Sequence, residues 1–258
     1  MDLAGAVVVV TGAGKGIGAA MSQKFAAGGA TVVVNDVDET AAHDVAGRIG
    51  GLALPGDAAS EAGAARLVEA ALAQYGRIDL FCANAGVARP GGPEAAEQDW
   101  ALSWETNVMA HVRAARAVLP HWLERGAGHF LVTASAAGLL TMLGSAPYSV
   151  TKHAALGFAE WMSVTYGDRG VTVQALCPQG VRTNMLADTG ESGQRLLASG
   201  ALEPDQVADE VVEALGDGRF LVLPHPEVAE YYAARAARPE KWQAGMRKLQ
   251  RKLEADES

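Results

Sequence analysis

Cysteines are scarce in this sequence, and long hydrophobic runs are absent. The two cysteines among 258 residues, Cys82 and Cys177, each lie in an apolar, strand-like run. This context favours buried, reduced thiols over a disulfide or a metal site. No apolar run approaches the roughly 18 residues that a membrane-spanning helix requires. The first residues, MDLAGAVVVVTG, lack the basic start and the small-residue cleavage site of a signal peptide. We therefore expect a cytoplasmic protein with no membrane partner.

Basic residues are outnumbered by acidic ones. The chain has 21 Lys and Arg against 30 Asp and Glu, a formal net charge of -9, and a pI near 5.2. Such a chain is poorly suited to bind nucleic acid or an anionic membrane. With 49% apolar and 20% charged residues, the composition is that of a globular protein. Small molecules remain as the expected partners. No metal site is expected, because the histidines lack metal-ligand spacing: His43, His111, His121, His129, His153 and His225.

Seven short, nearly continuous apolar runs alternate with helix-length segments. Parallel strands that are buried on both faces have this composition. The pattern predicts a seven-stranded parallel sheet with helices on both sides, which is a doubly wound α/β fold. With the strand order 3-2-1-4-5-6-7 that is typical of such sheets, another strand separates the two cysteines by about 10 Å, too far for a disulfide. The predicted strands are Ala6–Thr11, Ala30–Asp36, Leu52–Asp57, Ile78–Gly86, Gly128–Ser135, Val171–Pro178 and Arg219–Pro224.

The last part of the chain differs in composition from the rest. Before it, the longest helical patterns run from Asp99 to Arg125 and from about Tyr148 to Arg169. After Pro224 the sequence becomes a charged helical tail that Pro239 interrupts. We expect one α/β domain over residues 1–225 and a helical extension over residues 226–258, packed on the domain or on a neighbouring subunit. An apolar stripe follows the tail at helical spacing: Trp242, Met246, Leu249 and Leu253.

A glycine-rich turn follows the first predicted strand. The segment TGAGKGIG, from Thr11 to Gly18, leads into the helical AAMSQKFAAGG. Such a turn lets the backbone approach a pyrophosphate, while the N–H groups of the following helix point at its charge. A plain tight turn has the same composition, but the position at the first strand–helix junction of an α/β chain favours a dinucleotide. The pattern T-G-x-x-x-G-x-G, with Gly12, Gly16 and Gly18, fits better than G-x-G-x-x-[GA].

The second predicted strand ends at Asp36, eighteen residues beyond Gly18. A carboxylate there can accept hydrogen bonds from the adenosine ribose hydroxyls and would repel a 2′-phosphate, so NAD is favoured over NADP. Lys15 argues the other way, because a cation in the glycine turn can contact a 2′-phosphate. The residue after Asp36 is Val37, so this position supplies no second cation for a 2′-phosphate. Asp36 is also consistent with a helix cap before VDETAAHDVAG.

The segment YSVTK places Tyr148 and Lys152 one helical turn apart, on one helix face. A lone pair of this kind is usually a surface pair. Its alternative role is acid–base chemistry, since a phenol with a pKa near 10 needs roughly 4 kcal/mol of phenolate stabilisation to reach about 7. A cation about 4 Å away supplies around 4 kcal/mol at an effective dielectric of 20, but only about 1 in water. Such a pair therefore requires partial dehydration.

These motifs, in this order and spacing, resemble the short-chain dehydrogenase/reductase family, in its subgroup of single-domain enzymes. The resemblance covers roughly Leu3 to Pro224. It implies that residues 1–225 form a Rossmann-type dinucleotide-binding catalytic domain. The motifs that carry it are TGAGKGIG, GD at Gly56-Asp57, ANAG at Ala83 to Gly86, TNV at Thr106 to Val108, TASAAG at Thr133 to Gly138, YSVTK at Tyr148 to Lys152 and CPQGVRT at Cys177 to Thr183.

The resemblance also implies a role for each matching residue. The catalytic four would be Asn107, Ser135, Tyr148 and Lys152. Tyr148 would be the base, Lys152 would set its pKa, Ser135 would orient the substrate oxygen and Asn107 would hold a water. Where the family usually has P-G after the sixth strand, Gln179 follows Pro178 and Gly180 comes one place later, so this loop departs from the family pattern beside the expected nicotinamide. Besides Asp36, the expected cofactor contacts are Gly12, Lys15, Gly16, Ile17, Gly18, Asp57, Ala58, Asn84, Ala85, Gly86, Tyr148, Lys152, Pro178, Val181 and Thr183.

The expected activity is the NAD-dependent interconversion of a secondary alcohol and a ketone. An NADPH-linked carbonyl or 3-oxoacyl reductase is the alternative that Lys15 motivates, and a non-enzymatic nucleotide-binding scaffold is the other class. Self-association as a homodimer or homotetramer through the two long helices is expected by resemblance. The segment from Leu186 to Leu202 is a candidate substrate lid. Residues expected to flank an apolar cleft, although ordinary core positions would look alike, are Leu139, Leu140, Met142, Met185 and Leu186.

Overall fold

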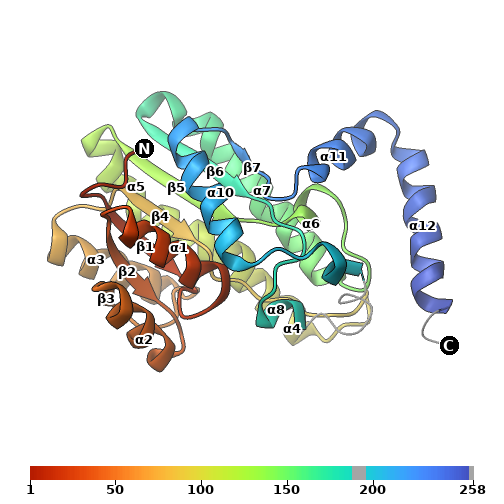
Figure 1. Cartoon of the computed structure of the whole chain (residues 1–258), viewed down its shortest axis with the longest axis horizontal. Helices are drawn as coiled ribbons and strands as arrows, with labels where there is room; N and C mark the ends of the chain where they lie inside the picture. Colours follow the sequence, from red (N-terminus) through yellow and green to blue (C-terminus); the bar gives the residue numbers. More distant parts are fainter. Residues whose placement is uncertain (188–195, 256–258) are drawn as a thin grey trace.

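The computed structural model describes residues 1–187 and 196–255. At its centre, seven parallel strands form one sheet in the order β3-β2-β1-β4-β5-β6-β7 (Figure 1). This arrangement confirms the fold class and the strand order expected from the sequence. The paired segments are shorter than the apolar runs that predicted them. They are β1 Val7–Thr11, β2 Thr31–Asn35, β3 Leu52–Ala53, β4 Leu80–Ala83, β5 Gly128–Thr133, β6 Val171–Leu176 and β7 Leu221–Val222.

Helices cover both faces of the sheet, and β1 shows why its strands are apolar throughout. Val8 and Val10 pack in the core beneath α1, α2 and α10, while Val9 packs in the core beneath α3, α5 and α7. All three valines are fully buried, so successive positions need apolar side chains on opposite faces. The helices are α1 Gly16–Ala27, α2 Glu39–Ile49, α3 Glu61–Tyr75, α5 Ala110–Arg125, α7 Ala146–Tyr166 and α10 Pro204–Asp217.

The long helix before β5 is not one continuous α-helix. A π-helical turn, η1 (Glu105–Met109), separates α4 (Glu97–Trp104) from α5, so the predicted uninterrupted helix from Asp99 is wrong in its middle. A π turn contains an extra residue and often marks a functional position. Here it carries Asn107. The shorter helical segments are α6 Ala136–Leu139, η2 Gly167–Arg169, α8 Asn184–Ala187 and η3 Ala198–Gly200; η2 replaces the last turn expected for α7.

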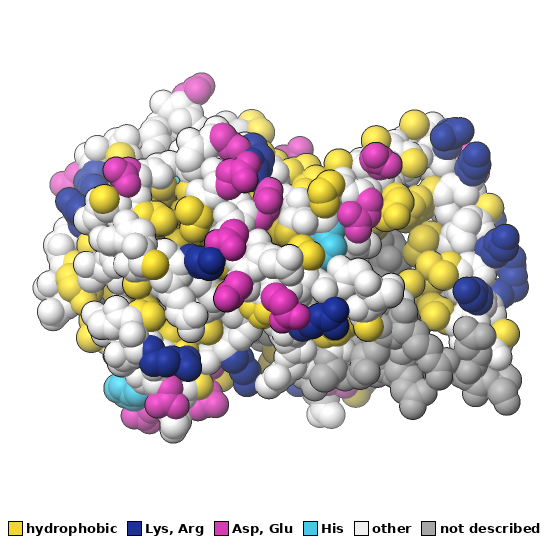
Figure 2. Space-filling view, in the orientation of Figure 1, with side chains coloured by type: hydrophobic (Ala, Val, Ile, Leu, Met, Phe, Trp, Pro, Cys, Tyr) yellow, Lys and Arg dark blue, Asp and Glu magenta, His cyan; other side chains and the backbone are white. Residues whose placement is uncertain are grey.

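Two helices form a C-terminal arm, α11 (Glu227–Ala237) and α12 (Pro239–Ala255). They are separated at Arg238, because a residue before proline is disfavoured in helical geometry. Figure 1 shows α12 standing to one side of the sheet and its covering helices. The residues of the predicted stripe are half-buried, and α12 buries no residue completely. In Figure 2 the basic side chains of α12 lie along its outer edge. The division at residue 225 stays a prediction.

The two cysteines lie where the strand order predicts. Cys82 is on β4, Cys177 directly follows β6, and β5 runs between them. Both thiols are free and buried, and burial raises the pKa of Cys177 to about 12. Among the described residues, no helix is long and apolar enough to cross a membrane, and no three His, Cys, Asp or Glu side chains gather as metal ligands. The central part of the predicted lid, residues 188–195, lies outside the described residues.

Candidate active site

The predicted nucleotide turn lies between β1 and α1, and its three motif glycines are each needed for backbone geometry. Gly12 and Gly16 have φ values of +61° and +57°, which side chains with a Cβ rarely adopt. A Cβ on Gly18 would lie 2.3 Å from the carbonyl oxygen of Gly12 and 2.6 Å from the Asn84 amide nitrogen. The turn and the start of α1 therefore approach each other closely. The N–H groups at such a helix end are suited to bind a pyrophosphate.

Asn84 braces this turn against the neighbouring strands. Its side-chain nitrogen donates to the carbonyl oxygens of Thr11 at 3.0 Å and Gly12 at 3.2 Å. Its oxygen accepts from the Thr133 hydroxyl at 3.0 Å. The Thr11 hydroxyl in turn accepts from the backbone N–H groups of Asn84 and Ala85. Asn84, predicted as a cofactor contact, thus joins the ends of β1, β4 and β5, and the sequence interpretation missed the two threonines.

Asp36 directly follows β2 and lies beside the glycine turn. Its Oδ2 accepts from the N–H of Gly14 at 2.8 Å, and its Oδ1 accepts from the N–H of Asp38 at 3.0 Å. The alternative interpretation of Asp36 as a helix cap is wrong, because Asp38 is the N-cap of α2 and accepts from the Ala41 N–H at 3.1 Å. The protein's own contacts thus hold the Asp36 carboxylate beside the glycine turn. Its contact with an adenosine ribose stays a prediction.

The remaining predicted adenosine and phosphate contacts lie around the same turn. Lys15 is exposed at the start of α1 and, together with Arg182 and Thr183, lines a cavity of about 410 Å³. Asp57 is exposed after β3, with its Oδ1 accepting from the Ala59 N–H at 2.9 Å. The other predicted contacts in this region are partly buried, except Ala58, which is buried: Ile17, Ala85, Gly86 and Ala58.

Tyr148, Lys152 and Ser135 converge at the carboxyl edge of β5. Ser135 is the N-cap of α6 and accepts from the Ala137 N–H at 3.1 Å. The Lys152 Nζ donates to the Thr133 carbonyl at 2.8 Å and lies 5.6 Å from the centre of the Tyr148 ring. The exposed fractions of Tyr148 and Lys152 are 9% and 2%. The ammonium and the phenol are therefore on the same side of the crevice and largely dehydrated, which excludes a surface pair.

Burial strengthens the attraction between the ammonium and a phenolate, but it also disfavours the charged form of each group. Burial raises the pKa of the Tyr148 phenol, and a hydrogen bond with Ser135 acts in the opposite direction. Burial also lowers the pKa of Lys152 to about 8. Burial therefore outweighs the expected lowering of the phenol pKa, because desolvation penalises the phenolate more than its neighbours stabilise it.

Asn107 connects the π turn to the residues around Lys152. Its Oδ1 accepts from the Val87 N–H, and its Nδ2 donates to the Val87 carbonyl, each at 2.9 Å. Nδ2 also donates to the Thr151 hydroxyl at 3.0 Å. The fully buried side chain thus holds the segment after β4 against α7, and its predicted role in holding a water stays a prediction.

His111 lies one helical turn after Asn107. Burial lowers the pKa of His111 to about 3, so this imidazole is neutral.

The loop after β6 turns despite lacking the usual glycine after proline. The Pro178 carbonyl accepts from the Ala136 N–H at 2.8 Å. The N–H of Gln179 donates to Nδ1 of the buried His225 at 3.2 Å, and Nε2 of that ring donates to the Gly200 carbonyl at 3.2 Å. Val181 then pairs with Leu202. His225, interpreted only as structural, therefore anchors the loop that carries Pro178, Val181 and Thr183. No sequence signal links two sites 46 residues apart.

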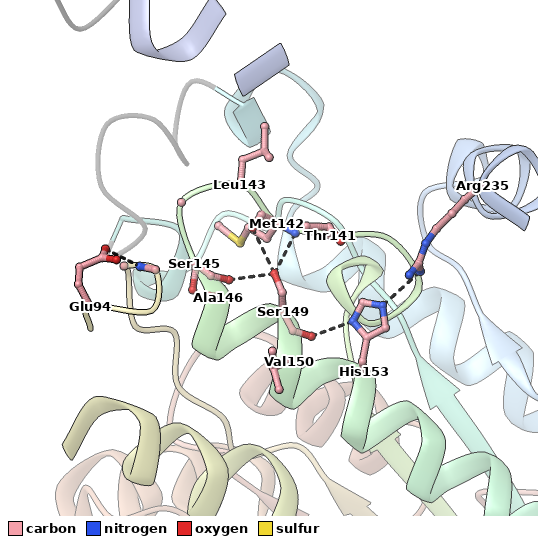
Figure 3. A pocket seen from close by; sticks show the side chains of 13 residues that line it. Glu94, Thr141, Met142, Leu143, Ser145, Ala146, Ser149, Val150, His153 and Arg235 are labelled. Atoms are coloured by element: carbon pink, nitrogen blue, oxygen red, sulfur yellow. Dashed lines mark hydrogen bonds between the residues drawn. The ribbon is translucent and has the colours of Figure 1, made fainter. Parts of the chain in front are cut away.

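Only some of the residues expected to line an apolar cleft lie beside the phenol. Met142 and Met185 pack against a cluster of Ala88, Ala137 and Tyr148. Leu139 and Leu140 are instead buried in the main core, so that part of the expectation is wrong. Short α6 turns their side chains inward, towards the core beneath α7. A second cavity, of about 690 Å³, is lined by Glu94, by residues 141–146 before and at the start of α7, and by Arg235 (Figure 3).

A glycine-rich phosphate turn joined to a buried tyrosine, lysine and serine defines a nucleotide-dependent oxidoreductase that acts on CH–OH groups. The family model described as short chain dehydrogenase matches residues 6–193, and the chain belongs to that family, the short-chain dehydrogenase/reductase family. Its sequence is 37% identical, over 86% of this chain and 84% of the relative, to a 1-deoxy-11-beta-hydroxypentalenate dehydrogenase of Streptomyces exfoliatus.

Two solved structures share the fold. One is a short-chain dehydrogenase/reductase from Burkholderia phymatum in complex with NAD, with a TM-score of 0.86, 30% identity, and coverage of 93% of this chain and 96% of that chain. The other is a 7α-hydroxysteroid dehydrogenase complexed with NADH and 7-oxo glycochenodeoxycholic acid, with a TM-score of 0.78, 26% identity, and coverage of 86% and 93%. Both similarities extend over nearly the whole of the compared chains.

Proposed function

We propose that this protein interconverts a secondary alcohol and its ketone with NAD, and that Tyr148 is the general acid and base. The observation that carries the proposal is the convergence of buried Tyr148, Lys152 and Ser135 at the edge of the sheet that also holds the glycine turn. Ligands bind doubly wound sheets at this carboxyl edge. The activity is tested by screening secondary alcohols for NADH formation, measured by absorbance.

Each residue has a distinct part in the proposed reaction. When bound, oxidised nicotinamide supplies the hydride acceptor and a positive charge. The alcohol loses its C–H hydrogen as hydride and its O–H proton to the Tyr148 phenolate, leaving the ketone. Ser135 orients the substrate oxygen by hydrogen bonding. Lys152 would stabilise the phenolate and hold the nicotinamide ribose. Asn107 keeps the segment after β4 in register with α7, and we retain its role in holding a water as part of the proposal.

NAD is favoured by the carboxylate of Asp36, which two backbone N–H groups hold in place. A 2′-phosphate beside it would be repelled, and the two compared structures contain NAD or NADH. Lys15 supports the alternative NADPH-linked reductase, although it is exposed and can turn into solvent. The cytoplasmic location is also part of the proposal, supported by the two free, buried thiols.

Replacing Asp36 with alanine tests this preference. The wild-type protein should use NAD over NADP by about 100-fold in kcat/KM, which corresponds to about 2.7 kcal/mol. The Asp36→Ala variant should lose most of that ratio, because the repulsion and the ribose hydrogen bonds disappear together. The matched control is Asp44→Ala, which removes an exposed carboxylate from α2. A wild-type preference for NADPH, or a ratio unchanged in Asp36→Ala, would contradict the assignment.

The substrate is proposed to be an apolar, alicyclic secondary alcohol. The side chains packed around the phenol are those of alanines and methionines, which offer apolar contact and no charge. The hydroxypentalenate and hydroxysteroid dehydrogenases named above support the same choice. A screen should therefore compare cyclic alcohols with short, polar diols, and faster turnover of the diols would contradict the substrate class.

Self-association through the two long helical segments, α4–η1–α5 and α7, is part of the proposal, as a homodimer or homotetramer. Large apolar side chains are exposed on both helices, and those of Trp161 and Val164 are 56% and 82% exposed. Changing both to glutamate should reduce the mass measured by light scattering to that of one 26.7 kDa chain, because charges at an apolar contact are not tolerated. Tyr232→Glu, at another exposed aromatic position, is the control. A monomeric wild-type protein would overturn the proposal.

A further inference from the structure

The C-terminal arm makes a specific connection to the part of the chain that carries the catalytic residues. Arg235, on α11, donates through Nη1 to the Leu139 carbonyl oxygen. The same nitrogen lies 3.2 Å from Nε2 of His153 (Figure 3). Among the described residues, no carboxylate lies within ion-pair distance of Arg235. The contacts of this guanidinium therefore link the arm to α6 and α7 rather than neutralise an acid.

The second contact continues as a chain of hydrogen bonds along α7. Nδ1 of His153 lies 2.8 Å from the carbonyl oxygen of Ser149. Because a carbonyl oxygen can only accept, Nδ1 carries the ring proton, and Nε2 is free to accept from Arg235. The Ser149 hydroxyl donates to the Ser145 carbonyl at 2.9 Å and accepts from the Met142 N–H at 3.0 Å. Figure 3 shows this chain running from the arm to the segment before α7.

The anchored residues are direct neighbours of the catalytic ones. Leu139 ends α6, the helix that Ser135 caps, while Ser149 and His153 follow Tyr148 and Lys152. The two helices are in close contact, because a Cβ on Gly138 would lie 2.5 Å from the Lys152 carbonyl oxygen. A small shift of α6 along α7 would therefore change the separation of the serine hydroxyl and the phenol. It would also move Met142, which packs against the cluster around the phenol.

We infer that Arg235 is a positioning residue that fixes α6 and residues 140–145 against the start of α7, so that Ser135 and Met142 keep their places beside Tyr148. Its effect on turnover rests on the alcohol oxidation proposed above. Arg235 is on α11 of the C-terminal arm. It lies outside residues 6–193, the part of the chain that the family model matches. A residue far from the reacting atoms can matter in this way, since a misplacement of about 1 Å can cost about 100-fold in rate.

The inference is tested with Arg235→Gln and Arg235→Lys, with Arg238→Gln as a matched control that removes an exposed guanidinium three residues further along the arm. Amide hydrogen exchange, which needs no substrate, is expected to become faster over residues 136–147 in Arg235→Gln and to stay unchanged in the control. The kcat for the alcohol is expected to fall about tenfold, with the affinity for NAD unchanged. Arg235→Lys keeps a donor and should recover part of both effects.

A second variant separates positioning from a folding defect. His153→Leu breaks the hydrogen-bond chain without changing the arm, and it should reproduce the exchange over residues 140–147. The double variant should be no worse than Arg235→Gln alone, because both changes act through one chain. Wild-type exchange and wild-type kcat in Arg235→Gln would overturn the inference. If the wild-type protein oxidises no alcohol while the exchange responds as expected, the proposed function fails and the positioning stands.

Discussion

Replacing Tyr148 with phenylalanine is expected to lower kcat by about 1,000-fold, within the range that a positioned acid or base contributes. The ring would remain packed against Ala88 and Ala137, so the fold and the nucleotide turn should persist. The change removes only the phenol oxygen, which accepts the alcohol proton in its phenolate form. Steady-state kinetics should therefore show the loss in kcat, while calorimetric titration should give an unchanged Kd for NAD.

The control for this variant is Tyr232→Phe, which removes a phenol hydroxyl from the exposed face of α11. It should retain full activity. The pH profile supplies a second readout. Because burial raises the pKa of Tyr148, the base form becomes populated only as the pH rises, and kcat/KM for oxidation should increase into the alkaline range. Substantial turnover by Tyr148→Phe, with the same profile, would remove the phenol from the mechanism.

Replacing Gly18 with alanine is expected to weaken nucleotide binding strongly. The new Cβ would lie 2.3 Å from the Gly12 carbonyl oxygen and 2.9 Å from the Ala13 Cα, so the turn must move away from α1. Overpacking of this kind costs about 1–3 kcal/mol in stability. The displaced N–H groups would no longer meet the pyrophosphate together. We expect Kd for NAD to rise at least 100-fold, about 2.7 kcal/mol, in a calorimetric titration, with activity lost in parallel.

Gly47→Ala is the matched control for this variant. Gly47 is also a helical glycine, on α2, but a Cβ there would have no neighbour within 4 Å. The same substitution should therefore stabilise the protein by up to about 1 kcal/mol, through helix propensity alone, and leave NAD binding intact. If Gly18→Ala binds NAD as tightly as the control does, the close approach of the turn to the helix is not what holds the nucleotide.

Most of the fold could be predicted because strand and helix patterns are local. Val8, Val9 and Val10 are apolar on both faces, a pattern that indicates a parallel sheet covered on two sides. The glycine turn could also be predicted, since a positive φ at Gly12 and Gly16 is favoured by the residue itself. The predicted strand ends were less accurate, because the length of strand pairing depends on the neighbouring strand and not only on the length of the apolar run.

The contacts that hold the site could not be predicted in the same way. Asn84 was expected to contact the cofactor, but it also braces the turn through Thr11 and Thr133. The π turn at Asn107 cannot be recognised from the spacing of apolar residues. His225 and Arg235 belong to no sequence motif. Each makes a hydrogen bond to a segment at least 46 residues away in the sequence. Such contacts depend on the path of the whole chain and therefore leave no local pattern.

The sequence by itself determined the doubly wound sheet and the glycine turn, and it indicated Tyr148 and Lys152 as the proposed catalytic pair. It did so because helix period, strand period and glycine conformation are properties of neighbouring residues. The tertiary structure alone decided how strongly that pair is dehydrated, and therefore that burial raises the pKa of the phenol. It also decided which distant side chains fix the loops around Tyr148. Both depend on which segments pack together, because desolvation and long-range hydrogen bonds arise only when the chain has folded.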